Sequence, residues 1–261
     1  METIASPTPV KVISRAGECM RMLMEAGLTF DALQAPIDDP GMRKRLVRFW
    51  ISGGYEATTT QKAARSIMGK NFFGIEEAVT HFGVRPTRSQ LSALAEIPFT
   101  EAELRETKDT HVLVAVFPLS ILDIRDCVKA KKLPNGQRFF YEQDWYNKQA
   151  FAKDRGDVSW QLVRKTPVEN STSKNWQEQQ ALLSDKEETP EAQVMVYTII
   201  GHFLATGERL FEKIYVRCPD VVSDGYRVYV GLFDSDGLVV DDGWDGNRGG
   251  GIGVSSARKS E

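Results

Sequence analysis

The residues whose types and spacing most suggest chemistry are the acidic side chains between Asp234 and Asp245. Asp234-Ser235-Asp236-Gly237 begins like a calcium-binding loop, in which carboxylate oxygens coordinate the ion. The EF-hand pattern requires one more ligand before the glycine and a glutamate at the twelfth position, which is Asp245 here. Asp241, Asp242 and Asp245 could still gather around an ion, but the match is poor and we predict no metal site.

Catalytic chemistry finds little support elsewhere in the sequence. The histidines form neither an HExxH pattern nor a metal-ligand pair, so each is expected to be structural or on the surface: His81, His111 and His202. The cysteines lie far apart, which fits a reducing compartment: Cys19, Cys127 and Cys218. GNRGGG, residues 246–251, lacks the Lys-Ser/Thr ending of a phosphate loop. We therefore predict neither an enzyme nor a bound cofactor.

The acidic residues belong to a segment of unusual composition, Gly231 to Gly251. Its 21 residues include five Asp, seven Gly and one Asn, and they contain no Lys, Glu, Gln or Met. Glycine and aspartate are depleted from strands, although the flanking RVYV and IGV sequences are typical of strands. The simplest interpretation is a glycine-rich surface loop.

A second interpretation comes from a resemblance. The Asp/Gly/Asn-rich stretch contains Trp244 and runs into Ile252-Gly253-x-x-x-x-Arg258 at the C-terminus. In this it resembles the variable proteins of diversity-generating retroelements. In that family an error-prone reverse transcriptase miscopies adenines of a template repeat, and the copy replaces the 3′ end of the protein gene. Altered AAY codons never encode Lys, Glu, Gln, Met or Trp, and Trp244 is the one residue of the segment outside that rule.

The resemblance implies a C-type-lectin-like fold that displays exchangeable side chains on a rigid scaffold. It implies that the diversified, ligand-facing positions are Phe233, Asp234, Asp236, Val239, Asp241, Asp242, Gly243, Gly246, Asn247, Gly249, Gly250 and Gly251. The residues implied to hold this variable region, about 231–258, in place are Leu238, Val240, Trp244, Arg248, Ile252 and Arg258. The segment has no Tyr, so its own side chains offer few aromatic anchors for binding.

Three other functions compete with this interpretation, and the first is a calcium- or glycan-binding lectin-like module without diversification. The lectin-like fold also serves the formylglycine-generating enzymes, but those need two neighbouring cysteines near the C-terminus, where this chain has Cys218 alone. The basic run Arg43, Lys44, Arg45 and Arg48 beside Trp50 could belong to a DNA-binding helical bundle. A solvated basic face on an amphipathic helix explains the same run, so nucleic acid is not the favoured partner.

The elements that must position these residues divide into two parts. Residues 1–105 read as short helices, with a proline start at Asp39-Pro40 and capping boxes at Thr87-x-x-Gln90 and Thr100-x-x-Glu103. Residues 106–261 read as strand, helix, strand, helix and then a run of strands. In that run Val228, Val230 and Leu232 are expected on one face, and Phe233 on the other. The fold class is α+β, with the lectin-like domain following a small helical region.

Composition limits the class of protein. Of 261 residues 33 are basic and 36 acidic, giving a net charge of −3, which does not favour a general nucleic-acid coat. The longest apolar run, residues 194–204, is too short and polar to span a membrane, and the N-terminus lacks a secretory signal pattern. We expect a protein of the cytoplasm or of a phage particle that binds a protein or a cell-surface molecule. An oligomer is compatible with the helical region.

Overall fold

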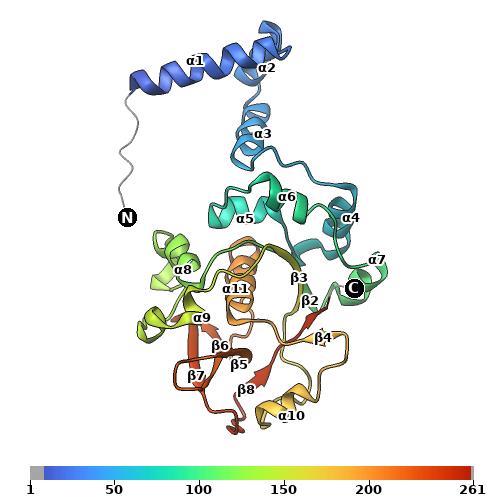
Figure 1. The fold of residues 1–261 in the computed structure, drawn as a ribbon, viewed down its shortest axis with the longest axis vertical. Coiled ribbons are helices and arrows are strands. Elements are labelled where there is room, and N and C mark those ends of the chain that lie inside the picture. Colours follow the sequence, from blue (N-terminus) through green and yellow to red (C-terminus); the bar gives the residue numbers. More distant parts are fainter. Residues whose placement is uncertain (1–8, 260–261) are drawn as a thin grey trace. The chain divides into compact units, whose positions relative to one another are not determined.

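The computed structural model describes residues 9–259, which form two compact units divided between Ile51 and Ser52 (Figure 1). The predicted boundary near residue 105 lies inside the second unit. The region 59–107 buries Phe72, Ile75 and Phe82 in the same hydrophobic core as the strand that begins at His111. Burial of large apolar side chains against the sheet therefore joins these helices to the second unit.

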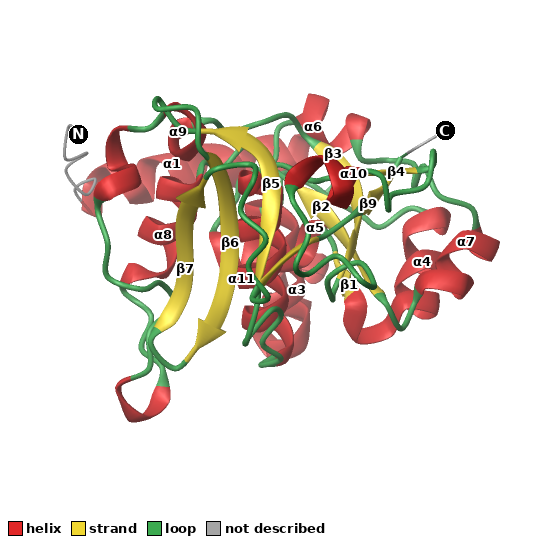
Figure 2. Cartoon of the chain, turned by 90° about the horizontal axis from the view of Figure 1, so that it is seen from below, coloured by secondary structure: helices red, strands yellow, loops and turns green. Residues whose placement is uncertain are grey.

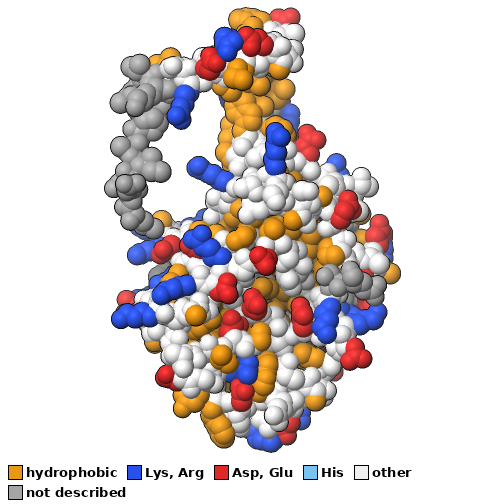
Figure 3. Space-filling model, viewed as in Figure 1, with side chains coloured by type: hydrophobic (Ala, Val, Ile, Leu, Met, Phe, Trp, Pro, Cys, Tyr) orange, Lys and Arg blue, Asp and Glu red, His pale blue; other side chains and the backbone are white. Residues whose placement is uncertain are grey.

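The first unit consists of three helices: α1 (Pro9–Glu25), α2 (Phe30–Asp38) and α3 (Pro40–Ile51). The predicted start at Pro40 is confirmed, and the Asp39 carboxylate accepts a hydrogen bond from the Gly41 amide at 2.7 Å. Neither α2 nor α3 contains a buried residue, and apolar side chains of both are exposed in Figure 3. The four basic residues of α3 are exposed as well.

Four capped helices begin the second unit: α4 (Thr59–Met68), α5 (Ile75–Phe82), α6 (Arg88–Ala93) and α7 (Glu101–Thr107). Both predicted capping boxes are confirmed, at Thr87 with Gln90 and at Thr100 with Glu103. In each box the threonine oxygen and the side chain of the third residue satisfy backbone amides that have no partner within the helix.

Two sheets follow. The first has the order β1-β2-β3-β9-β4 and contains β1 (Phe72–Phe73), β2 (His111–Val116), β3 (Ser159–Arg164), β4 (Glu187–Glu188) and β9 (Ala257–Arg258). The second has the order β7-β6-β5-β8 and contains β5 (Tyr215–Val221), β6 (Arg227–Asp234), β7 (Gly237–Gly243) and β8 (Ile252–Val254). Strands β7, β6 and β5 run side by side as one curved sheet in Figure 2.

The remaining helices are α8 (Ile121–Lys129), α9 (Ala150–Lys153), α10 (Trp176–Gln180) and α11 (Ala192–Thr206), with short 3-10 turns at Gly69–Asn71, Pro134–Gly136 and Trp145–Lys148. Helix α11 contacts β2 of the first sheet and β5 and β6 of the second. It is buried from Ala192 to His202, which explains why its sequence is apolar on all sides. The core of the second unit is therefore built around α11.

The observed alternation in β6 differs from the predicted one at its end. Val228 and Val230 are buried as expected, but Phe233 is fully buried too, while Leu232 is only half-buried. A register irregularity between Gly231 and Asp234, with Leu232 at φ 45°, adds a residue to this strand. A bulge of this kind moves the next side chain to the opposite face, so Phe233 packs against Phe203 of α11 with ring centroids 5.0 Å apart.

The fold is thus a mixed α+β structure, and the order strand, helix, strand, helix and run of strands predicted from residue 106 onward is present with α9, α10 and β4 in addition. Across residues 9–259, none of the helices combines the length and the apolar character that crossing a bilayer requires.

We expect the second unit to fold without the first. A chain that starts at Ser52 keeps the whole core around α11, so its thermal midpoint should lie within about 3 °C of that of the full chain. Circular dichroism of both chains during heating measures this. A midpoint lower by ten degrees or more would contradict the division into units.

Candidate functional site

Strand β7 forms the edge of its sheet, and the segment 137–145 covers that edge. The Gln143 side chain pairs with both backbone groups of Val240, donating to its carbonyl at 2.7 Å and accepting from its amide at 3.3 Å. The Trp145 indole donates to the same carbonyl at 3.1 Å, and Phe140 bridges to Leu238. An exposed strand edge invites unwanted pairing, so this cover fixes the β6–β7 hairpin as a rigid edge of the domain.

A cavity of about 400 Å³, here called the hairpin cavity, lies between this cover and the hairpin. It is lined by Tyr141, Gln143, Trp145, Tyr215, Leu232, Asp234, Asp236, Val239 and Asp241. Four of these, Asp234, Asp236, Val239 and Asp241, are predicted ligand-facing positions. The structure therefore brings predicted positions from two strands and their turn to one concave surface.

The hairpin cavity combines carboxylates with aromatic rings and has no Lys or Arg in its lining. Asp234 shapes the hairpin turn, because its carboxylate accepts a hydrogen bond from the Asp236 amide at 2.8 Å. The Tyr215 and Tyr229 rings stack edge to face with centroids 4.8 Å apart. Burial first, and then the Asp241 carboxylate, raise the pKa of both phenols, so both hydroxyls remain neutral hydrogen-bond donors.

The second part of the predicted variable region, Trp244–Gly251, is here called the C-terminal loop. Arg217 of β5 is its central anchor: its guanidinium is buried and donates to the carbonyl of Asn247 at 2.5 Å. The same group donates to the Lys174 carbonyl at 3.1 Å and to Gln179 Oε1 of α10 at 2.8 Å. Burial lowers the pKa of Arg217. The loop is thus tied to α10 through one buried cation.

Further bonds attach the C-terminal loop through its backbone. The amides of Trp176 and Ser173 donate to the carbonyls of Asp245 at 2.9 Å and Gly249 at 3.2 Å, and the Tyr215 amide donates to the Gly251 carbonyl at 3.0 Å. These bonds use backbone atoms on the loop side, so they do not depend on which side chains the loop carries.

Two loop side chains also take part in anchoring. Arg227 of β6 binds the Asp245 carboxylate through two nitrogens, at 2.6 and 2.9 Å, and its guanidinium lies 4.0 Å from the Trp176 ring centre. Arg248 pairs with Glu178 at 2.8 Å, with both side chains largely exposed. Asp245 was not among the predicted ligand-facing positions, and its carboxylate is used for structure. Arg248 was predicted to hold the loop, and its ion pair with Glu178 lies on the surface.

The glycines of the region fall into two groups by the space around them. A Cβ at Gly250 or Gly251 would meet no atom closer than 3.8 Å, and one at Gly249 none closer than 3.4 Å. At Gly231 and Gly237, by contrast, it would lie 2.1 and 2.3 Å from backbone atoms. Gly249, Gly250 and Gly251 are predicted variable positions, whereas Gly231 and Gly237 are not. The glycines predicted to vary at the end of the loop have room for a side chain.

The other predicted ligand-facing positions differ in exposure. Asp234, Asp236, Gly250 and Gly251 are exposed, whereas Val239, Asp241, Asp242, Gly243, Gly246, Asn247 and Gly249 are half-buried. Burial raises the pKa of Asp242. A Cβ at Gly243 would approach the Tyr229 ring at 3.1 Å, and one at Gly246 would displace the Trp244 ring. Phe233 corrects the prediction, because the bulge in β6 places it in the core, away from any ligand.

Most of the predicted scaffold residues are buried or half-buried. Leu238, Val240 and Ile252 are buried, and Arg258 of β9 is half-buried beside Glu106 at 3.5 Å. Trp244 differs from the expectation, since it is 63% exposed and its ring covers Gly246. This ring is therefore an aromatic surface available to a ligand.

The side chains considered for a metal site or a reactive thiol are not arranged for either chemistry in this part of the chain. Asp241 and Asp242 occupy successive positions of β7 and so point to opposite faces, while Asp245 is bound by Arg227. Within residues 9–259 no three His, Cys, Asp or Glu side chains are placed to hold a metal ion. Cys218 is fully buried, and burial raises the pKa of its thiol well above the usual value.

Sequence reasoning missed the residues that the framework contributes to the site. Tyr141, Gln143 and Trp145 lie almost a hundred positions before β7 in the chain, and Arg217 reads as an ordinary strand arginine. The aromatic stretch FFYEQDWY, residues 139–146, was the available signal, because so many aromatics in an irregular segment indicate a packed surface.

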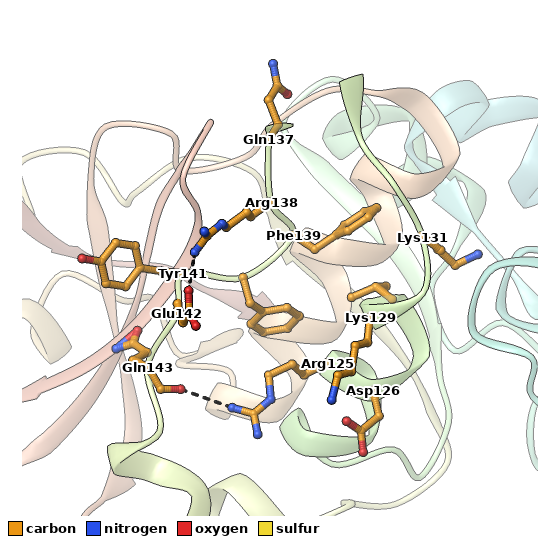
Figure 4. A pocket seen from close by; sticks show the side chains of 12 residues that line it. Arg125, Asp126, Lys129, Lys131, Gln137, Arg138, Phe139, Tyr141, Glu142 and Gln143 are labelled. Atoms are coloured by element: carbon orange, nitrogen blue, oxygen red, sulfur yellow. Dashed lines mark hydrogen bonds and ion pairs between the residues drawn. The ribbon is translucent and has the colours of Figure 1, made fainter. Parts of the chain in front are cut away.

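A second cavity, of about 420 Å³, lies on the other side of this segment, toward α8 (Figure 4). Figure 4 shows Arg138 directed at Glu142 and Arg125 at the carbonyl of Gln143, with distances of 2.7 and 3.3 Å. Arg125 also binds Asn147 at 2.7 Å. Arg125 of α8 therefore holds the segment that covers β7 and supports the hairpin cavity indirectly, whereas the exposed Arg138–Glu142 pair lies within the segment itself.

Comparison of this chain with protein-family models, with curated proteins and with solved structures finds no match.

The glycines provide a matched pair of variants. Gly231→Ala would place a Cβ 2.1 Å from the Ile214 carbonyl oxygen at a φ of 151°, so we expect a loss of about 3 kcal/mol in unfolding free energy. Gly251→Ala meets no atom within 4 Å and should change stability by less than about 0.5 kcal/mol. Urea unfolding measures both. Equal losses of unfolding free energy in the two variants would contradict the division of the glycines into crowded and open positions.

Arg217 can be tested against Arg248. Arg217→Met removes the donor from three acceptors, of which Gln179 Oε1 is buried and the other two are half-buried, so we expect a loss of about 2 kcal/mol and faster amide hydrogen exchange in residues 245–251. Arg248→Met removes an exposed ion pair and should cost under about 1 kcal/mol with unchanged exchange. Hydrogen exchange read by mass spectrometry distinguishes the two, and unchanged exchange in Arg217→Met would refute the anchor.

Proposed function

We propose that this protein binds a ligand through the hairpin cavity and the C-terminal loop. We further propose that a diversity-generating retroelement varies the predicted ligand-facing positions on these two surfaces. The scaffold is proposed to be C-type-lectin-like. The observation that carries the proposal is the room for side chains at Gly249, Gly250 and Gly251, in a loop whose anchors reach its backbone. A diversified surface needs both properties, because each exchange must leave the scaffold intact.

The anchoring pattern supports the proposal further. Arg217 lies outside the segment 231–251, and its bond in the loop is to the Asn247 carbonyl, which every residue type would supply. The bonds from the Trp176 and Ser173 amides share this property. Asp245 and Arg248, whose side chains do anchor the loop, are both absent from the set of positions proposed to vary.

The order of the elements supports the scaffold. Strand β2, helix α8, strand β3, helix α11 and the strands β5 to β9 follow the order expected from the resemblance. Strand β9 pairs with the earlier strand β3 at Leu162 and Val163. Pairing of this kind closes the domain and leaves the hairpin and loop as its variable surface.

The chemistry of the site favours a ligand that carries positive charge. Asp234, Asp236 and Asp241 line the hairpin cavity, and Tyr141, which is 49% exposed, adds an aromatic contact. The framework thus supplies the aromatic anchors that the variable segment lacks. We propose that the protein with this particular variable sequence binds a basic surface on a protein or on a cell-surface molecule.

Sequencing the DNA downstream of the gene tests the diversification directly. We expect a near-copy of the codons for residues 231–258 that differs mainly at adenines, with a reverse transcriptase gene beside it. Absence of both in an intact locus would overturn diversification and leave a binding protein of fixed specificity.

Two neighbouring valines test the display surface at the protein level. Val239→Asp, at a proposed variable position on the cavity, should cost under about 1 kcal/mol. Val240→Asp places the same carboxylate in the core, where Val240 is fully buried, and should cost more than about 4 kcal/mol. Thermal unfolding of the two variants compares them. Similar losses would mean that the hairpin cavity cannot accept exchanged side chains.

A further inference from the structure

A third concave surface, here called the acidic cavity, has a volume of about 520 Å³ and shares no lining residue with the hairpin cavity. It lies where the connection between α9 and β3 meets the connection between β4 and α11. Four carboxylates line it: Asp154, Asp157, Glu188 and Glu191. Its lining contains no Lys, Arg or His.

The negative charge of the acidic cavity is not compensated from within. Burial raises the pKa of Glu191, and the neighbouring carboxylates Asp220, Asp154, Asp157 and Glu188 raise it further. Burial likewise raises the pKa of Asp220, which caps α11 by accepting from the Ala192 amide at 2.7 Å. The four lining carboxylates are themselves exposed, but like charges near one another still oppose ionisation, so a bound cation would relieve the repulsion at Glu191.

Gln193 gives independent support for a ligand. Its side chain is 2% exposed and lines the acidic cavity, and its amide nitrogen donates to the Leu119 carbonyl at 2.7 Å. Its Oε1 therefore faces the other way, toward Gly156 of the cavity wall, where a Cβ would lie 3.3 Å from it. This oxygen has no hydrogen-bond partner among the described residues. A buried acceptor without a partner is costly, and an N–H donor in the cavity would satisfy it.

The rest of the lining specifies the kind of cation. Within residues 9–259 no three carboxylates of this cavity lie close enough together to hold a metal ion. Pro190, Val194 and Pro219 add apolar surface between them. Separated carboxylates with apolar surface between them match a chain of methylenes that carries ammonium groups. Each ammonium offers three N–H donors to carboxylate oxygens or to Gln193.

We propose that the acidic cavity binds an alkylammonium cation, with Asp154, Asp157, Glu188 and Glu191 pairing with its charges. A primary ammonium of this type occurs in free polyamines and in lysine side chains, and the test distinguishes the two sources. The site is independent of the hairpin cavity, so its occupation does not rest on the function proposed above.

Isothermal titration calorimetry of the full chain with spermidine, with a trilysine peptide and with Mg²⁺ tests the proposal. Saturable binding of spermidine alone identifies a free polyamine, and tighter binding of trilysine identifies a lysine side chain. Binding should weaken as salt is added, because charge pairs carry it. Equal binding of Mg²⁺ would reduce the site to general attraction of cations and overturn the proposal, as would the absence of binding by both amines.

A double variant and its charge-matched control complete the test. Asp157→Asn with Glu191→Gln should weaken amine binding at least tenfold without lowering the thermal midpoint, because the change removes a repulsion. Asp185→Asn with Glu212→Gln removes the same charge from exposed residues outside the cavity lining and should leave binding unchanged. Equal loss in both variants would refute the site. A double variant that binds normally would refute it as well.

Discussion

The buried guanidinium of Arg217 is the interaction on which the candidate binding surface depends. A charged group inside a protein is costly unless its donors find acceptors, and the two terminal nitrogens of Arg217 bind the backbone of the C-terminal loop, the chain before α10 and the side chain of Gln179, while its Nε has no partner among the described residues. One side chain of β5 therefore holds two segments that are distant in sequence, residues 174–179 and the C-terminal loop. Because the loop contributes a backbone carbonyl to this contact, the bond to Arg217 does not depend on which side chain residue 247 carries.

In the β6–β7 hairpin, strand geometry separates the residues of the core from those that line the cavity. Strand alternation separates Val240, in the core, from Val239 and Asp241, on the cavity. The bulge at Gly231 and Leu232 then turns Phe233 inward, where it joins the aromatic packing beneath α11. Gly231 and Gly237 allow the close backbone approaches that this path requires. Core and surface positions thus alternate within a few residues, which allows one set to change while the other stays fixed.

Charge is distributed unevenly over this mildly acidic chain. Both the hairpin cavity and the acidic cavity are lined by carboxylates without cations, whereas Arg217, Arg227 and Arg209 are used inside the scaffold. Arg209 stacks on Phe203 and Phe233 and donates to the Asp234 carbonyl, so it supports the hairpin turn from below. Arginine suits this role because its planar group packs on aromatic rings while it binds several acceptors. The carboxylates left at the concave surfaces give both of them an affinity for positive charge.

The sequence by itself determined the local elements and the α+β class. Capping boxes at Thr87 and Thr100, the proline start at Pro40 and the strand at His111 depend on neighbouring residues, so short-range chemistry specifies them. Only the tertiary structure decided the boundary at Ile51, the inward turn of Phe233, the exposure of Trp244 and the meeting of Tyr141, Tyr215 and Asp241 at one cavity. These features depend on contacts between residues far apart in the chain and on a bulge that shifts the strand period, and neither leaves a local pattern in the sequence.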